Sequence, residues 1–342
     1  MADGRTAPPR CHAVVARLLL AAAVSSGVPA DGAGAEWTAV ADTKISYTTD
    51  AFQFSSARRL RFSEDPSQPT VVPVNKPDDV IWEPSLELIR SFASGPDRTD
   101  VSFKAHGFLY TNNPIFNHGD YRFQVKRTLG AGTSVLLRYR YVPNLFLGPN
   151  TERRTGLQTT QEERVTTNKW RLEVERRLSE NFTATLVGRY GLRSYNDAFA
   201  ERDTHFWGTG PTLAYRLTPR ATVNLNYLYE RGIADGKGDT RYNDDVSYRL
   251  HHVSGGTEVL LEHHWSLALT YTFQRKNFTS DLAGDTHNGR QDNLHQGLLE
   301  LAYRPKANLS FTLSFQQTQR SSNNTLRGFN DTIYSIGGEY RF

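Results

Sequence analysis

Apolar and polar side chains alternate along most of the chain, from about residue 44 to the end. The clearest stretch is 265–273, where Trp, Leu, Leu, Tyr and Phe occupy every second position and Ser, Ala, Thr and Thr lie between them. The stretch 309–316 repeats this arrangement with Leu, Phe, Leu and Phe against Ser, Thr, Ser and Gln. A period of two residues is typical of β-strands whose two faces meet different surroundings. The pattern therefore predicts a structure built from long strands.

The chemistry of the two faces distinguishes a membrane barrel from a soluble sandwich. Segment 223–230 sets Val, Leu, Tyr and Tyr against Asn, Asn, Leu and Glu, so that the second face mostly carries groups that favour water. A soluble sandwich would pack Val, Ile and Leu on its inward face, and its strands are mostly about 5 to 6 residues long. Strands of about twice that length, with a polar inner face and an aromatic and apolar outer face, are typical of transmembrane β-barrels.

The alternation predicts about 14 strands, and the connections between them are alternately short and long, as in bacterial outer-membrane barrels. The predicted strands lie near 44–57, 79–93, 99–112, 117–129, 132–146, 164–179, 181–196, 203–217, 220–234, 245–261, 264–278, 290–304, 307–321 and 328–342. The long polar connections are 58–78, 146–163, 234–245 and 278–290. Gly255-Gly256 interrupts the alternation, which predicts a bulge. We predict an all-β fold, an antiparallel up-and-down transmembrane β-barrel whose even strand number lets its two edges pair.

The N-terminal region has the layout of a signal peptide. An arginine-bearing start precedes the apolar run 13–24, and small residues that end at Ala35 follow it. We therefore predict a signal peptide over 1–35 and a barrel over 36–342, with Ala30 as a second possible cleavage site. Cleavage after Ala35 would remove Cys11, the only cysteine, and leave 37 basic and 34 acidic residues. This mild charge does not by itself argue for a nucleic-acid partner, and none is expected.

The last strand carries the most specific signal in the sequence. Tyr334, Ile336 and Gly338 alternate with other residues and lead to Tyr340 and the terminal Phe342. This strand resembles the recognition strand of Gram-negative outer-membrane proteins. The resemblance implies location in the cell outer membrane, insertion by the barrel-assembly machinery through Tyr340 and Phe342, and contact with outer-membrane lipids and lipopolysaccharide.

Outward aromatic residues are expected to form two girdles at the membrane interfaces. One set lies near the short turns and comprises Trp265, Tyr215, Tyr303 and Tyr340. The other lies toward the opposite strand ends and comprises Tyr141, Tyr190, Tyr229 and Phe273.

The predicted barrel is wide enough to hold water, because 14 tilted strands give a radius of about 14 Å. About eight residues separate Glu36 from the first predicted strand, too few for an N-terminal plug domain. Any constriction is therefore expected from loops, and the connections 58–78 and 146–163 are long enough to fold inward.

Basic residues dominate one inner wall of the predicted barrel. They are Arg122, Lys126, Arg138, Arg140, Lys169, Arg171, Arg189, Arg193 and Arg216. The opposite wall is expected to be neutral, with Ser266, Thr270, Thr272, Ser310, Thr312, Ser314 and Gln316. A basic stripe in an aqueous passage selects anions, so the pattern favours a porin-like channel for small anionic solutes or acidic oligosaccharides. The alternative is that these cations pair with acids such as Glu173 and Glu175 to stabilise the wall.

Two other functions are alternatives to the channel. A scaffold barrel of a surface export or electron-conduit assembly, with an unidentified periplasmic or surface partner, fits the same fold. A hydrolase resembling the omptin proteases would need a cluster of carboxylates and histidine, for which Asp203, His205, Asp244 and Asp245 are the candidates. We expect no enzymatic activity, no catalytic residues and no cofactor.

No metal site is expected from the sequence. The adjacent pairs His251-His252 and His263-His264 would point to opposite faces of a strand. The loop with Asp281, Asp285 and Asp292 gives only a weak indication of Ca²⁺ binding.

Overall fold

The computed structural model describes residues 35–58, 60–61, 65–66, 78–130, 132–324 and 327–342. Residues 1–34, which make up nearly all of the predicted signal peptide, lie outside the described residues, so the signal peptide stays a prediction. Within the described part of the chain, no helix is long and apolar enough to cross a membrane.

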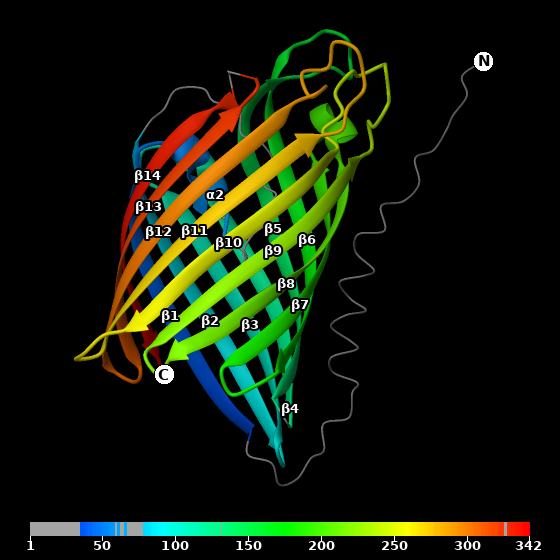
Figure 1. Ribbon diagram of the computed structural model, residues 1–342. Coiled ribbons are helices and arrows are strands. Elements are labelled where there is room, and N and C mark those ends of the chain that lie inside the picture. Colours follow the sequence, from blue (N-terminus) through cyan, green and yellow to red (C-terminus); the bar gives the residue numbers. More distant parts are fainter. Residues whose placement is uncertain (1–34, 59, 62–64, 67–77, 131, 325–326) are drawn as a thin grey trace. The chain divides into compact units, whose positions relative to one another are not determined.

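The described residues form a closed antiparallel barrel of 14 strands, in which each strand pairs with its neighbours in sequence and β1 pairs with β14 (Figure 1). The strands are β1 (Ala35–Thr48), β2 (Asp79–Ser94), β3 (Asp97–Tyr110), β4 (His118–Leu129), β5 (Thr133–Thr151), β6 (Thr160–Arg177), β7 (Phe182–Tyr195), β8 (Thr204–Thr218), β9 (Ala221–Ala234), β10 (Tyr248–Leu260), β11 (Trp265–Phe278), β12 (Gln291–Lys306), β13 (Leu309–Ser322) and β14 (Phe329–Arg341). The predicted fold and strand number are confirmed.

Helices are few and short among the described residues. They are α2 (Ala51–Arg58) and the 3-10 turns η1 (Pro114–Phe116) and η2 (Asp197–Arg202). Connections at one end of the barrel are short, whereas those at the other end, including 235–247 and 279–290, are long. We call these the short-turn end and the long-loop end; the C-terminus lies at the short-turn end (Figure 1).

The last strand closes the barrel against the first. Val40 lies opposite Arg341, and the backbone N–H of Phe342 donates to the carbonyl oxygen of Ala39 at 2.8 Å. The rings of Tyr340 and Phe342 contact each other edge to face, with centroids 4.7 Å apart. Closure leaves no strand edge unpaired, as a barrel in lipid requires.

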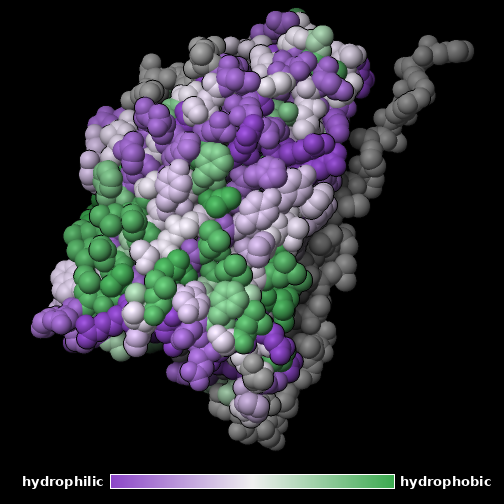
Figure 2. All heavy atoms as spheres, in the orientation of Figure 1, coloured by the Kyte–Doolittle hydropathy of each residue, from purple (hydrophilic) through white to green (hydrophobic). Residues whose placement is uncertain are grey.

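The alternation in the sequence places apolar side chains on the outside of the barrel. Leu269 and Leu313 are about half exposed there, at 53% and 52%. Figure 2 shows the apolar residues gathered in a band across this face, with hydrophilic residues toward both ends. This surface suits a hydrocarbon layer and would be unfavourable in water.

The first predicted strand is wrong by about nine residues, whereas the other 13 agree within a few residues. The prediction placed it at 44–57, but β1 ends at Thr48 and the chain then leaves the wall to form α2. Phe52 and Phe54 continue the period of two into the helix, which made the segment resemble a strand. The backbone N–H groups of Gln53 and Phe54 both donate to the carbonyl oxygen of Asp50 at 3.0 Å, which starts the helical turn.

Two further expectations about the chain path are corrected. Gly255 and Gly256 lie in an unbroken ladder with β9 and β11, so there is no bulge at these residues. Most of the predicted loop 146–163 extends β5 and β6 into a hairpin, whose connection is only 152–159. That segment is therefore mostly a strand hairpin rather than a long loop.

The described part of the connection after β1 lies inside the barrel. Phe54 of α2 is fully buried among inward residues that include Phe108 and Ile333. Beyond the helix, Arg61 forms an ion pair with Glu300 at 2.8 Å, and Asp65 forms one with Arg193 at 3.4 Å. The described part of this connection thus narrows the lumen toward the long-loop end.

Candidate functional site

Inward side chains change from accessible to buried along the barrel axis. Toward the short-turn end, Lys126, Thr270 and Ser314 are half-buried. Toward the long-loop end, Arg193 and Glu230 are almost completely buried. The inward side chains are therefore more accessible toward the short-turn end than where α2 and many charged side chains meet.

The structure places the predicted basic residues on the inward face of β4 to β8. Five are buried, namely Arg140, Lys169, Arg171, Arg189 and Arg193. Arg122, Lys126 and Arg138 are half-buried, and Arg216 is exposed at the short-turn end.

Several of these cations pair with carboxylates, either on a neighbouring strand or on their own strand. Arg140 donates from Nε to both carboxylate oxygens of Asp120 on β4, each at 2.9 Å. Arg171 forms an ion pair with Glu173. Ion pairing with carboxylates therefore accounts for part of the basic stripe, as expected if these cations stabilise the wall.

A pocket lies inside the barrel at the long-loop end, and most of its charged lining side chains are cations. Its lining comprises Asn150, Glu163, Arg193, Tyr195, Arg202, Thr204, Val246, Tyr248, Lys276, Phe278, His287, Arg290 and Arg327. Five of these side chains are Lys or Arg, against one carboxylate.

Aromatic rings hold several of the pocket cations in place. The Nζ atom of Lys276 lies 4.2 Å from the centroid of the Tyr248 ring and 5.0 Å from that of Phe278. The guanidinium carbon of Arg193 lies 4.2 Å from the centroid of the Phe206 ring. The face of an aromatic ring attracts a cation without cancelling its charge. These contacts therefore order positive groups and leave the pocket positive.

Two glycines make room for these rings on the neighbouring strand. Gly191 lies opposite Phe206, and Gly232 lies opposite Tyr248. A Cβ atom at either glycine would lie 2.2 Å from a ring atom, far inside van der Waals contact. Only glycine lets each ring lie this close to the wall.

The pocket cations differ in how far carboxylates neutralise them. Arg202 pairs with Glu163 at 2.6 Å and with Asp244 at 2.7 Å. Among the described residues, neither Lys276 nor Arg327 has a carboxylate at ion-pair distance. Burial and then the nearby guanidinium groups lower the pKa of Arg327, which is the expected response of a cation in a positive environment.

Sequence reasoning missed this pocket because it took the inward faces of β11 and β13 as neutral. The inward face of β11 is neutral only toward the short-turn end, where Ser266 and Thr270 lie. Toward the long-loop end the same inward face continues through Gln274 to Lys276, and Arg290 and Arg327 follow in the connections. Extending the alternation of β11 to its end would have found Lys276.

The predicted interface aromatics lie on the outside of the barrel in two sets of contacts. At the short-turn end, Trp265 stacks on Tyr303 with centroids 4.7 Å apart, and Tyr215 lies beside Phe182 at 6.5 Å. Farther along the strands the ring pairs are Tyr141 with Tyr121, Tyr190 with Trp170, Tyr229 with Trp207, and Phe273 with His295.

The structure does not bring the hydrolase candidates together. His205 is exposed on the outer face of β8, where its Nδ1 atom lies 3.4 Å from the hydroxyl of Tyr190. Asp244 and Asp245 are buried in the connection between β9 and β10. A water-activating cluster of these residues is therefore absent from the described part of the chain.

Comparisons with known proteins agree with this fold. No protein-family model matches the chain, and no curated protein matches it in sequence. Among solved structures, the barrel is similar to the outer membrane channel DcaP of Acinetobacter baumannii, with a TM-score of 0.53 and 12% identity over 91% of this chain and 98% of that one. It is also similar to a loop-deletion mutant of OmpT, an outer membrane protein of Vibrio cholerae, with a TM-score of 0.52 and 8% identity over 91% of this chain and 100% of that one. The chain thus has the fold of outer-membrane β-barrels, and at these identities the likeness shows the fold alone.

Proposed function

We propose that this protein is an outer-membrane channel for small solutes that favours anions, organic anions included. The observation that carries the proposal is the positive lumenal pocket, in which Lys276 and Arg327 have no carboxylate at ion-pair distance among the described residues. A charged group in a passage with a low-dielectric wall attracts ions of opposite sign. An anion entering here would meet two cations that have no carboxylate of the described residues at ion-pair distance.

The filling of the lumen favours small solutes over long polymers. Helix α2 is packed against inward residues of β2, β3 and β14. Gln296 on β12 donates from its side-chain nitrogen to the carbonyl oxygen of Ala57 at 2.6 Å, which fastens the helix to the wall. The passage beside the pocket is therefore narrower than the strand number alone implies.

Paired organic solutes provide a direct test of the proposal. Purified protein in liposomes should admit a small dicarboxylate faster than a neutral sugar of similar size. Lys276→Gln and Arg327→Gln should each reduce dicarboxylate entry several-fold and leave sugar entry nearly unchanged. Lys237→Gln, which removes the same charge from an exposed loop position, is the matched control and should have little effect.

Two outcomes would contradict the proposal. Entry of both solutes at equal rates in wild-type protein would remove the anion preference. A barrel that admits neither solute would instead favour the scaffold function.

A further inference from the structure

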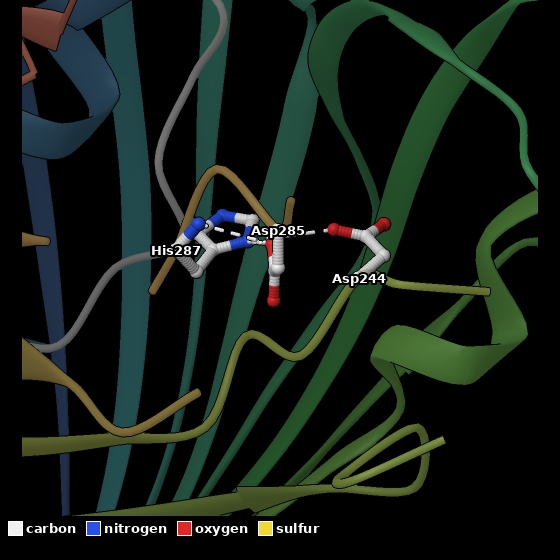
Figure 3. A group of neighbouring side chains, drawn as sticks. All are labelled: Asp244, Asp285 and His287. Atoms are coloured by element: carbon white, nitrogen blue, oxygen red, sulfur yellow. Dashed lines mark hydrogen bonds and ion pairs between the residues drawn. The ribbon is translucent and has the colours of Figure 1, made fainter. Parts of the chain in front are cut away.

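Three side chains with metal-binding atoms meet at the long-loop end, beside the cations of the pocket. Figure 3 shows Asp244, Asp285 and His287 directed toward one another from two connections, 235–247 and 279–290. The Nδ1 atom of His287 lies 3.0 Å from Oδ1 of Asp285 and 3.4 Å from Oδ1 of Asp244. One donor atom from each residue lies within 4.8 Å of the other two. All three side chains are buried.

Both carboxylates are held in position by other groups. Oδ2 of Asp285 accepts hydrogen bonds from the Ser280 hydroxyl at 2.6 Å and from the backbone N–H of Asp245 at 2.9 Å. Oδ2 of Asp244 accepts a hydrogen bond from Nε of Arg202 at 2.7 Å. The Oδ1 atoms of the two aspartates are thereby fixed facing the imidazole, which is the preorganisation that a metal site needs.

One of these oxygens lacks a donor. Among the described residues, Oδ1 of Asp244 is buried and accepts no hydrogen bond. A buried acceptor without a partner is unfavourable, and this one points at the imidazole nitrogen that Asp285 also contacts. A cation between the three atoms would supply the missing interaction.

We propose that Asp244, Asp285 and His287 bind one Zn²⁺ ion, which joins the β9–β10 connection to the β11–β12 connection. Zn²⁺ accepts imidazole nitrogen and carboxylate oxygen together, and two ligands about 2.1 Å from a tetrahedral ion are about 3.4 Å apart. The two observed distances from the imidazole nitrogen are close to that value. Ca²⁺ takes about six to eight oxygen ligands, so the histidine disfavours it. The ion takes the lone pair of Nδ1 in the neutral tautomer of His287 that carries its proton on Nε2, so the ring loses no net proton.

The proposed metal site adjoins the positive pocket through His287. His287 also lines the positive pocket, so the ion would fix one wall of that pocket as well as the two connections. The metal site does not depend on the proposed anion preference, because its ligands and their geometry are independent of what crosses the barrel.

The test is zinc content and affinity of the full chain, folded in detergent, stripped of metal and dialysed against Zn²⁺ alone. The wild-type protein should hold about one ion per chain, and His287→Ala should weaken its binding by at least about tenfold. Asp244→Asn is a second variant that retains an oxygen for Arg202 but loses the charge that the ion needs. Circular dichroism should confirm that both variants keep their strand content.

The matched control removes the two adjacent histidines at the short-turn end. His263→Ala combined with His264→Ala should leave zinc binding unchanged, because both residues are exposed in a turn far from the cluster in sequence and structure. The proposal is overturned if wild-type protein and His287→Ala bind zinc equally, if the control abolishes binding, or if Ca²⁺ competes zinc away at similar concentrations.

Discussion

The ammonium group of Lys276 lies 4.2 Å from the centre of the Tyr248 ring, on the neighbouring strand of the barrel wall. The hydroxyl of the same tyrosine donates to Glu230 at 2.6 Å and accepts from Arg193 at 2.8 Å. Tyr248 therefore orders two cations at once, and Gly232 leaves space for its ring. Side chains from β7, β9, β10 and β11 thus position the two cations Arg193 and Lys276 in the lumen.

Gly232→Ala should disturb this arrangement. The added Cβ atom would lie 2.2 Å from the Tyr248 ring, so the ring must move away from the wall and from Lys276. Overpacking of this kind costs about 1–3 kcal/mol of folding free energy, measured by urea titration in lipid vesicles. Gly188→Ala is the control, because a Cβ there meets no atom within 4 Å. Equal stability of the two variants would mean that the ring position does not depend on Gly232.

The buried pair between Arg140 and Asp120 should matter more than an exposed pair of the same kind. Asp120→Ala leaves the Arg140 guanidinium buried without its main partner, which should cost about 3–5 kcal/mol. Asp97→Ala breaks the accessible pair with Arg127 and should cost less than about 1 kcal/mol. Urea titration of both variants measures the difference. Similar costs would indicate that water reaches Arg140 freely.

The fold could be predicted from the sequence because each strand repeats the same physical requirement. Lipid outside and polar groups inside impose a period of two over many residues, and the stretch 265–273 shows it without interruption. The same rule failed at Phe52 and Phe54, because alternation over a few residues cannot distinguish a strand from a short buried helix.

The site could be predicted only in part. Sequence alone gave the inward direction of Arg140 and Arg193, since direction follows from the period. It could not give their partners, because Asp120 lies on another strand and Asp65 lies in the connection beyond α2. The contact between Asp244 and His287 depends on how two connections pack together, and no local sequence pattern encodes that packing.

Arginine substitutions should distinguish the two faces of β11. Leu269→Arg places a charge on the lipid side and should cost about 2–4 kcal/mol in a vesicle refolding titration. Thr270→Arg places it in the half-buried lumen and should cost much less. Equal costs would contradict the assignment of the outer face.

The long loops should face the cell exterior, as in other bacterial outer-membrane barrels. Trypsin added to intact cells should cut after Lys237 or Arg241, which are exposed in the β9–β10 connection. It should spare Arg177, which is exposed beside the short turn after β6. Gel analysis of the fragments measures this, and cleavage at Arg177 before any cut in the loop would invert the orientation.

The zero-current potential of the purified barrel in a planar lipid bilayer tests the anion-channel proposal most directly. In a potassium chloride gradient, wild-type protein should give the sign expected for chloride preference, and higher salt should reduce the value because mobile ions screen the pocket. Lys276→Glu combined with Arg327→Glu should reverse the sign, since both residues line the positive pocket. A wild-type barrel that does not conduct, or that prefers potassium, would contradict the proposal.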